Sequence, residues 1–341
     1  MRLGSQKRKG IVTGGTWCAD HNKCVSHWPG EEEVVEILTN EVRGGGSACN
    51  LAIDLKRLDP DFSVSTIGLI GDDEDGRTLI AEADAAGIAL SGLAIAENGS
   101  TSHTDAFTAA DTGRRTHLYL PGTAAQLTPD HFDFSGVMAR ILHLGLPGLH
   151  AKLDSAWGDD VNGWVTVLKR ARAAGIATNL ELCSIPAERI AQIVRPCLAH
   201  LDLLVVNDFE IAAIAGLETG HGVEVDVEQC LSAARKVLSK GSMQLVVAHF
   251  PGGAVAAGPG GEEILKPSLD IPAEAIQGTN GAGDAFASGL LYGLHQEWSV
   301  TEAIELGHAA AAASVRGLGT TDTVVSWQEC LELASCWGWQ N

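Results

Sequence analysis

The sequence has no apolar run long enough to cross a membrane, and its basic residues are few. Its 341 residues contain 23 Lys and Arg against 43 Asp and Glu, which gives a formal net charge of −20. A transmembrane helix needs roughly 18 or more consecutive apolar residues, so none is expected. The negative charge disfavours nucleic acid and anionic membrane surfaces as partners. It does not exclude an anionic nucleotide that backbone N–H groups and a metal ion hold locally.

The N-terminal segment also lacks the apolar region of a signal peptide. Residues 1–9 carry Arg2, Lys7, Arg8 and Lys9, and no hydrophobic stretch follows them. We interpret them as a basic tail and, by default, expect a cytoplasmic protein. The eight cysteines are scattered without a Cys-x-x-Cys pair, which favours reduced thiols.

A zinc site is the alternative for part of this cysteine content. Cys18, His21, Cys24 and His27 recur at every third residue. Neither a helix nor a strand directs four side chains at that spacing to one point. Structural zinc sites usually take ligand pairs from separate segments, so we disfavour zinc here.

The remaining composition is that of a folded α/β protein. Apolar residues make up 45% of the chain and charged residues 19%, which is sufficient for a large core. From residue 140 onward, apolar runs at 141–146, 177–182, 201–206 and 245–248 alternate with segments of helical periodicity. This alternation predicts a parallel sheet covered by helices. Ligand sites in such sheets lie beyond the carboxyl ends of the strands.

The most informative segment is residues 278–286, Gly-Thr-Asn-Gly-Ala-Gly-Asp-Ala-Phe. Apolar residues at helical spacing follow its glycines, so the glycines open a helix: Phe286, Leu290, Leu291 and Leu294. A helix N-terminus holds phosphate oxygens without basic side chains. The carboxylate of Asp284 is placed to take a proton from an attacking hydroxyl. An anion-binding helix N-terminus beside a carboxylate base favours phosphoryl transfer. The alternative is an ordinary glycine-rich turn in which Asp284 only interacts favourably with the helix dipole.

The stretch from Gly281 to Phe286 resembles the C-terminal signature of the PfkB, or ribokinase-like, carbohydrate kinases, and further matches extend over nearly the whole chain. The resemblance implies a three-layer α/β/α core with a mainly parallel sheet and a small β-lid. It implies one kinase domain over residues 10–335, with a discontinuous lid from insertions at about 16–43 and 98–121. The lid is also a candidate surface for a homodimer.

Two segments near the N-terminus resemble the family's sugar site. Gly45, Gly46 and Asn50 match a Gly-Gly-x-x-x-Asn element whose glycines form the lid hinge and whose Asn contacts the sugar. Asp20 follows the first predicted strand, where the family has an aspartate that accepts hydrogen bonds from sugar hydroxyls. Without the family, the same residues are a glycine turn into a helix that Ser47 caps, and a solvated loop acid.

Asn207 and Glu210 follow the predicted strand at 201–206 and resemble the family's Asn-x-x-Glu motif. The resemblance implies that Asn207 supports the phosphates and that Glu210 organises Mg²⁺ through water, which suits an ion that keeps several waters. Alone, the pair is a good helix N-cap signal. Gly253 and Thr279 are assigned to the nucleotide on the same resemblance.

Two departures from the family pattern matter. Gly278 stands where the family usually has an aspartate that helps to bind a monovalent cation, so we expect little activation by K⁺. Residues 249–251, His-Phe-Pro, differ from the family's nucleotide segment and leave the donor nucleotide open. Arg114 and Arg115 of the lid are interpreted as a solvated hairpin tip rather than a phosphate clamp.

Together these features predict a kinase that uses ATP and Mg²⁺ to phosphorylate a hydroxyl of a sugar or sugar derivative. Asp284 is the expected general base, and the anion hole is the backbone around it: Gly281, Ala282 and Gly283. A nucleoside kinase of the same fold and a sugar- or nucleotide-binding sensor without turnover remain alternatives. A dinucleotide oxidoreductase is disfavoured because no Gly-x-Gly-x-x-Gly follows the first predicted strand.

Overall fold

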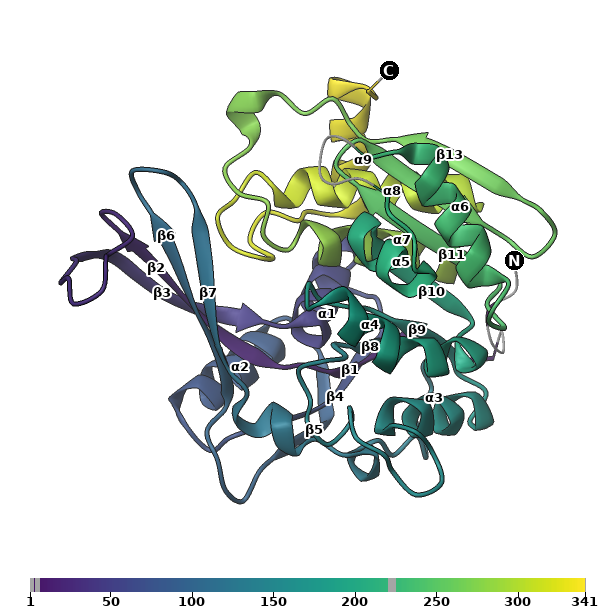
Figure 1. The fold of residues 1–341 in the computed structure, drawn as a ribbon, viewed down its shortest axis with the longest axis horizontal. Coiled ribbons are helices and arrows are strands. Elements are labelled where there is room, and N and C mark those ends of the chain that lie inside the picture. The colour runs from purple at the N-terminus through teal and green to yellow at the C-terminus, as the bar shows by residue number, and fades with distance from the viewer. Residues whose placement is uncertain (1–2, 4–6, 220–224, 341) are drawn as a thin grey trace.

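A large sheet lies between two layers of helices, and a small second sheet extends from one side (Figure 1). This computed structural model describes residues 3, 7–219 and 225–340. The expected basic tail, residues 1–9, is therefore described only at residues 3 and 7–9. Leu3 is buried, its carbonyl accepts a hydrogen bond from Arg140 Nε, and Arg8 donates to the carbonyl of Ala174.

The large sheet has the strand order β13-β12-β11-β10-β9-β8-β1-β4-β5, and seven of these strands run parallel. The strands β12 and β13 pair antiparallel at one edge. The central strands are buried on both faces, as their continuous apolar sequences predict. The bounds are β1 Ile11–Gly15, β4 Val64–Ile70, β5 Ala89–Ile95, β8 Ile141–Gly145, β9 Ala177–Leu180, β10 Leu203–Asn207, β11 Leu245–Phe250, β12 Gly253–Ala257 and β13 Glu263–Pro267.

Each face of this sheet packs on its own layer of helices. One core forms against α1 Ser47–Leu58, α2 Glu74–Ala85, α7 Ala282–His295, α8 Val300–Ser314 and α9 Trp327–Trp337. The other forms against α3 Gly163–Ala173, α4 Ala187–Val194, α5 Asp208–Ala215 and α6 Val227–Leu238. Alternate strand residues enter alternate cores: Leu203 belongs to the first and Leu204 to the second.

The small sheet is the lid, with the order β3-β2-β6-β7. Its strands come from two separate parts of the chain: β2 Cys18–Val25 and β3 Ile37–Gly45, then β6 Ser102–Ala109 and β7 Arg115–Leu120. The two parts join through parallel pairing of β2 with β6. The predicted three-layer core with a discontinuous β-lid is confirmed.

Two lid histidines connect the small sheet to helix α2. The rings of His21 and His103 stack with centroids 4.9 Å apart. His21 Nε2 lies 2.9 Å from Asp75 Oδ1 in α2, and His103 Nδ1 lies 3.9 Å from Asp75 Oδ2.

The prediction that Ser47 caps helix α1 was wrong. Gly46 precedes the helix with φ of 84°, and Ser47 is the first helical residue. Among the described residues, no helix is both long and apolar enough to span a membrane. All eight cysteines are unpaired.

Candidate active site

A cavity of about 580 Å³ lies between the lid and the carboxyl ends of the central strands. It brings together most of the predicted site residues: Asp20, Gly46, Asn50, Asn207, Glu210, Thr279, Gly281, Gly283 and Asp284. Gly45 adjoins the cavity through Asp20, and Ala282 lines a second cavity beside it. Gly253 lines neither; it is the first residue of β12 and pairs with Phe250 and Pro267 in the sheet.

The N-terminus of α7 forms one wall of this cavity. Gly281 is its N-cap with φ of 75°, in the left-handed region that favours glycine. A Cβ at this position would lie 2.2 Å from the carbonyl oxygen of Thr320. The tight turn therefore requires glycine, and it places the start of α7 beside the cavity.

Asp284 lies in the first turn of α7 and is held by an amide. Asn50 Nδ2 donates a hydrogen bond to Asp284 Oδ2 over 2.9 Å. Asn50 is 4% exposed, and its Oδ1 has no hydrogen-bond partner among the described residues. Burial, and next the charge of Glu181, raise the pKa of Asp284 well above its usual range, while the bond from Asn50 opposes the rise.

The sequence analysis missed Glu181, which follows β9 and lines the cavity beside Asp284. Its Oε2 lies 2.6 Å from Nε2 of His143 in β8. Asn179 Nδ2 lies 3.1 Å from the other ring nitrogen of His143 and is placed to donate to it. Burial lowers the pKa of His143 to about 4, so the ring is neutral near pH 7. The network assigns its proton to Nε2, which donates to Glu181.

Asp20 enters the cavity from the lid strand β2. Burial raises its pKa to about 6, and the nearby charge of Arg115 partly offsets that rise. An ideal Cβ at Gly45 would lie 2.4 Å from the carboxyl carbon of Asp20. Glycine at position 45 is what allows this carboxyl to pack against the backbone.

Asn207 and Glu210 form a reciprocal cap at the start of α5. Asn207 Oδ1 accepts from Glu210 N over 2.9 Å, and Glu210 Oε2 accepts from Asn207 N over 3.0 Å. The simpler interpretation, a helix N-cap, is therefore correct for both residues, although both also line the cavity. Burial, together with the nearby charge of Glu181, raises the pKa of Glu210 to about 8.

A second cavity of about 430 Å³ adjoins the first. Four residues line both: Asn207, His249, Thr279 and Gly283. The far wall includes α8, where Ala311 and Ala312 leave room for a flat group. His308, also in α8, is 5% exposed, and its Nε2 has no hydrogen-bond partner among the described residues.

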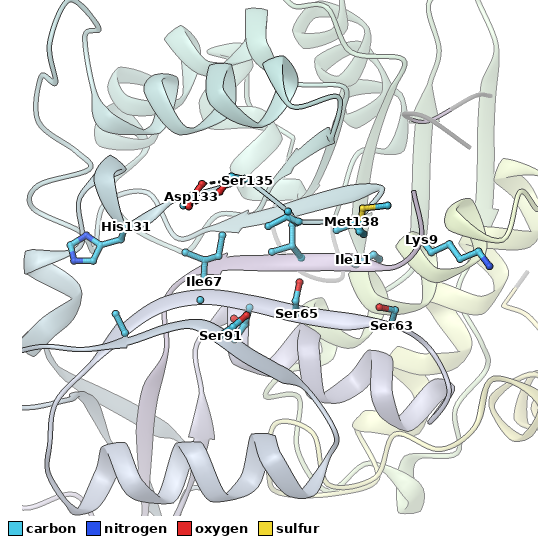
Figure 2. Close-up of a pocket in the computed structure, with 17 residues that line it drawn as sticks. Lys9, Ile11, Ser63, Ser65, Ile67, Ser91, His131, Asp133, Ser135 and Met138 are labelled. Atoms are coloured by element: carbon cyan, nitrogen blue, oxygen red, sulfur yellow. Dashed lines mark hydrogen bonds between the residues drawn. The ribbon is translucent and has the colours of Figure 1, made fainter. Parts of the chain in front are cut away.

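A further cavity of about 510 Å³ lies elsewhere, against β1, β4 and β5. Figure 2 shows Ser65, Ile67 and Ser91 on one side and the segment with Asp133 and Ser135 on the other. Asp133 accepts hydrogen bonds from the backbone and hydroxyl of Ser135, each 2.8 Å long. None of the predicted site residues lines this cavity, so it is not the candidate active site.

The family of the chain follows from comparison with known proteins. A model of the pfkB family of carbohydrate kinases matches residues 9–327. The chain belongs to this family. The predicted family and the prediction of a carbohydrate kinase are both confirmed.

Individual relatives differ in their named substrates. The chain is 27% identical over 309 residues to an ATP-dependent ribose-1-phosphate kinase of Halopiger xanaduensis, covering 89% of this chain and 92% of that one. It is 27% identical over 328 residues to a 5-dehydro-2-deoxygluconokinase of Geobacillus kaustophilus, covering 94% and 91%. The structure of Arabidopsis thaliana ribokinase complexed with ribose and ATP matches with a TM-score of 0.78 at 22% identity, covering 96% of this chain and 98% of that one.

Proposed function

We propose that this carbohydrate kinase transfers the terminal phosphoryl group of ATP to a hydroxyl of a sugar or sugar derivative. The observation that carries the proposal is the position of Asp284. Its carboxyl lies in the first helical turn behind Gly281, in the cavity between lid and core, and Asn50 holds one of its oxygens. A base and an anion-binding helix terminus thus meet at one point.

The residues divide the chemistry between them. Asp284 takes the proton of the attacking hydroxyl, and Asn50 orients the carboxylate for that transfer. The backbone N–H groups of residues 282–284 stabilise the charge that develops on the transferred group. Asp20 and the unpartnered Oδ1 of Asn50 accept hydrogen bonds from other hydroxyls of the substrate.

The second cavity fits the nucleotide. Its small residues on α8 leave space for a base, and it opens to the α7 terminus through Thr279 and Gly283. Unpartnered His308 Nε2 offers the base one polar contact. Asn207 lines both cavities, which supports its expected position near the phosphates. Gly253 lines neither cavity, so its expected contact with the nucleotide has no such support.

The carboxyl oxygens in the main cavity are the kind of donor that Mg²⁺ prefers. Among the described residues, no three His, Cys, Asp or Glu side chains converge to form a metal site. We infer that Glu210 would hold Mg²⁺ through water. Bound Mg²⁺ neutralises charge on the phosphates during transfer.

A dimer through the lid is a further part of this proposal. Apolar side chains of the lid are about half exposed, which supports a partner on this sheet: Ile37, Leu38, Leu118 and Leu120. Light scattering should give the mass of two chains, and a monomer at micromolar concentration would argue against the dimer.

The kinase assignment is tested with Asp284→Asn and an ATP-consumption assay over a panel of sugars and nucleosides. Loss of a general base typically costs ~10²–10⁴-fold in rate. We expect a loss of that size in kcat, with nucleotide affinity near that of the wild type. Asp130→Asn, at an exposed pair with Arg170, is the matched control. Wild-type turnover in Asp284→Asn would refute the assignment, and sugar binding without any turnover by the wild type would favour the sensor.

A further inference from the structure

We propose that the acceptor site selects uncharged polyhydroxylated molecules and rejects sugars that already carry a phosphate or carboxylate group. The inference rests on the proposed kinase function and concerns its substrate class. Four carboxyl groups line the main cavity: Asp20, Glu181, Glu210 and Asp284. No lysine or arginine among the described residues lines it.

The basic side chains of the lid are placed elsewhere. Lys23 pairs with Asp105, and Arg43 pairs with Glu41 at the surface. Arg114 is exposed at the tip of the β6–β7 hairpin. These three cations are therefore not available to an anionic group of the acceptor.

Arg115 is the lid cation whose charge acts on the cavity, and its buried Nε has no hydrogen-bond partner among the described residues. Its Nη2 donates to Oδ1 of Asn22, and its charge acts on Asp20. It thus offsets part of the negative charge that the chain itself places there. An anionic acceptor would compete with Asp20 for this one cation and would disfavour ionisation of the other acidic side chains, including the general base Asp284.

The hydrogen-bonding character of the cavity gives an independent reason. Asn50 is 4% exposed, and its Oδ1 lacks a partner among the described residues, so it is an acceptor that awaits a donor. The carboxyl groups of Asp20 and Asp284 also offer acceptor oxygens. Hydroxyl groups supply donors to all of them, whereas an ionised phosphate supplies none.

The proposed selection of uncharged acceptors differs from the substrate that the name of one relative gives. A ribose-1-phosphate kinase acts on a sugar that carries a phosphate. An anionic group placed against these four carboxyl groups costs affinity and suppresses the wrong ligand. We expect the ratio of kcat/KM for an uncharged sugar to that for its phosphate to be at least about 100, which corresponds to ~2.8 kcal/mol.

The test compares matched pairs under saturating Mg²⁺ and ATP: ribose with ribose 1-phosphate and ribose 5-phosphate, fructose with fructose 6-phosphate, gluconate with glucose, and adenosine with AMP. Product formation is followed by ³¹P NMR. The proposal is supported when the uncharged member of a pair is phosphorylated and its anionic partner is at least about 100-fold poorer. It is overturned when a phosphosugar or a sugar acid is the better substrate, while the kinase function itself then stands. ATP-independent binding without turnover of any compound would instead refute the kinase function.

A pair of lid variants checks that charge is the cause. His117 lines the cavity from β7 and is solvent-exposed, so His117→Arg should fold and place a cation at the acceptor site. Ala110→Arg adds the same charge at the exposed hairpin turn. We expect His117→Arg to reduce the selection ratio at least about tenfold and Ala110→Arg to leave it unchanged. Equal ratios in both variants, with melting temperatures like the wild type, would contradict an electrostatic origin.

Discussion

Oε2 of Glu181 lies 2.6 Å from Nε2 of His143 at the base of the cavity that holds Asp284. The buried, neutral imidazole donates a hydrogen bond to this carboxyl group, while burial raises the pKa of Glu181. The charge of Glu181 is, after burial, the largest cause that raises the pKa of Asp284. The two carboxyls are therefore coupled, and the protonation of one depends on the other.

The first prediction concerns the pH dependence of Glu181→Gln. A general base acts when deprotonated, so activity falls as the pH drops through its pKa. The variant removes a negative charge from Asp284 and lowers that pKa. The acidic limb of kcat/KM should shift to lower pH. Glu188→Gln, on an exposed position of α4, is the control; an acidic limb that stays in place or moves upward would refute the coupling.

The second prediction concerns stability at Asp54 in α1. Both carboxyl oxygens of Asp54 are buried without a hydrogen-bond partner among the described residues. Burial, and next the charge of Asp284, raise its pKa well above the usual value. The folded state then binds more protons than the unfolded state, so this group destabilises the fold progressively as the pH rises above ~4.

Asp54→Asn removes this titration. The free energy of unfolding should rise relative to the wild type by ~1–3 kcal/mol at pH 8, and the gain should shrink as the pH is lowered to 5. Urea unfolding at both values measures it, with the exposed Asp61→Asn as control. A gain that is the same at both pH values would show that burial of the charge is not the cause.

The third prediction separates the two roles of Glu210. Gln can replace Glu in a capping box, so Glu210→Gln keeps the bond to the backbone of Asn207 and removes only the ionisable carboxyl group. The Mg²⁺ concentration for half-maximal rate should increase several-fold, with little change in melting temperature. Glu210→Ala should lose both the cap and the Mg²⁺ response. Unchanged Mg²⁺ dependence in the Gln variant would leave Glu210 with the structural role alone.

The fourth prediction concerns K⁺. Gly278 has no carboxylate to offer a cation, and a Cβ there would lie 3.0 Å from the carbonyl oxygen of Gly317. Its backbone N–H donates to the carbonyl of Val315, which holds the loop without an ion. Initial rates at constant ionic strength should be similar in K⁺, Na⁺ and a large organic cation. Activation by K⁺ alone would mean that carbonyl ligands suffice.

The sequence was most informative where a short segment supplied both geometry and chemistry. Gly281 and Asp284 are three residues apart, and the apolar period after them identifies the helix they start, so their meeting in one cavity was predictable. The same local logic predicted the cap formed by Asn207 and Glu210. The residues of other segments that surround this cap could not be predicted from the local sequence.

The sequence analysis missed the contact between Glu181 and His143 because the two residues belong to neighbouring strands that are distant in the sequence. His143 lies within β8, and Glu181 follows β9, 38 residues later. Their contact depends on the pairing of β8 with β9. A signal did exist: Glu181 follows a buried strand at the edge where Asn207 was recognised. It was passed over because the predicted strand at 177–182 included it, whereas β9 ends at Leu180.

The parallel pairing of β2 with β6 has a consequence for the order in which the molecule is made. Each half of the lid contributes one antiparallel pair of strands. The two pairs join where β2, residues 18–25, pairs with β6, residues 102–109. During synthesis the first half emerges long before its partner, with one edge of β2 unpaired until then. The lid side of the acceptor site, which Asp20 lines from the first half and His117 from the second, is thus complete only after about a third of the chain has left the ribosome.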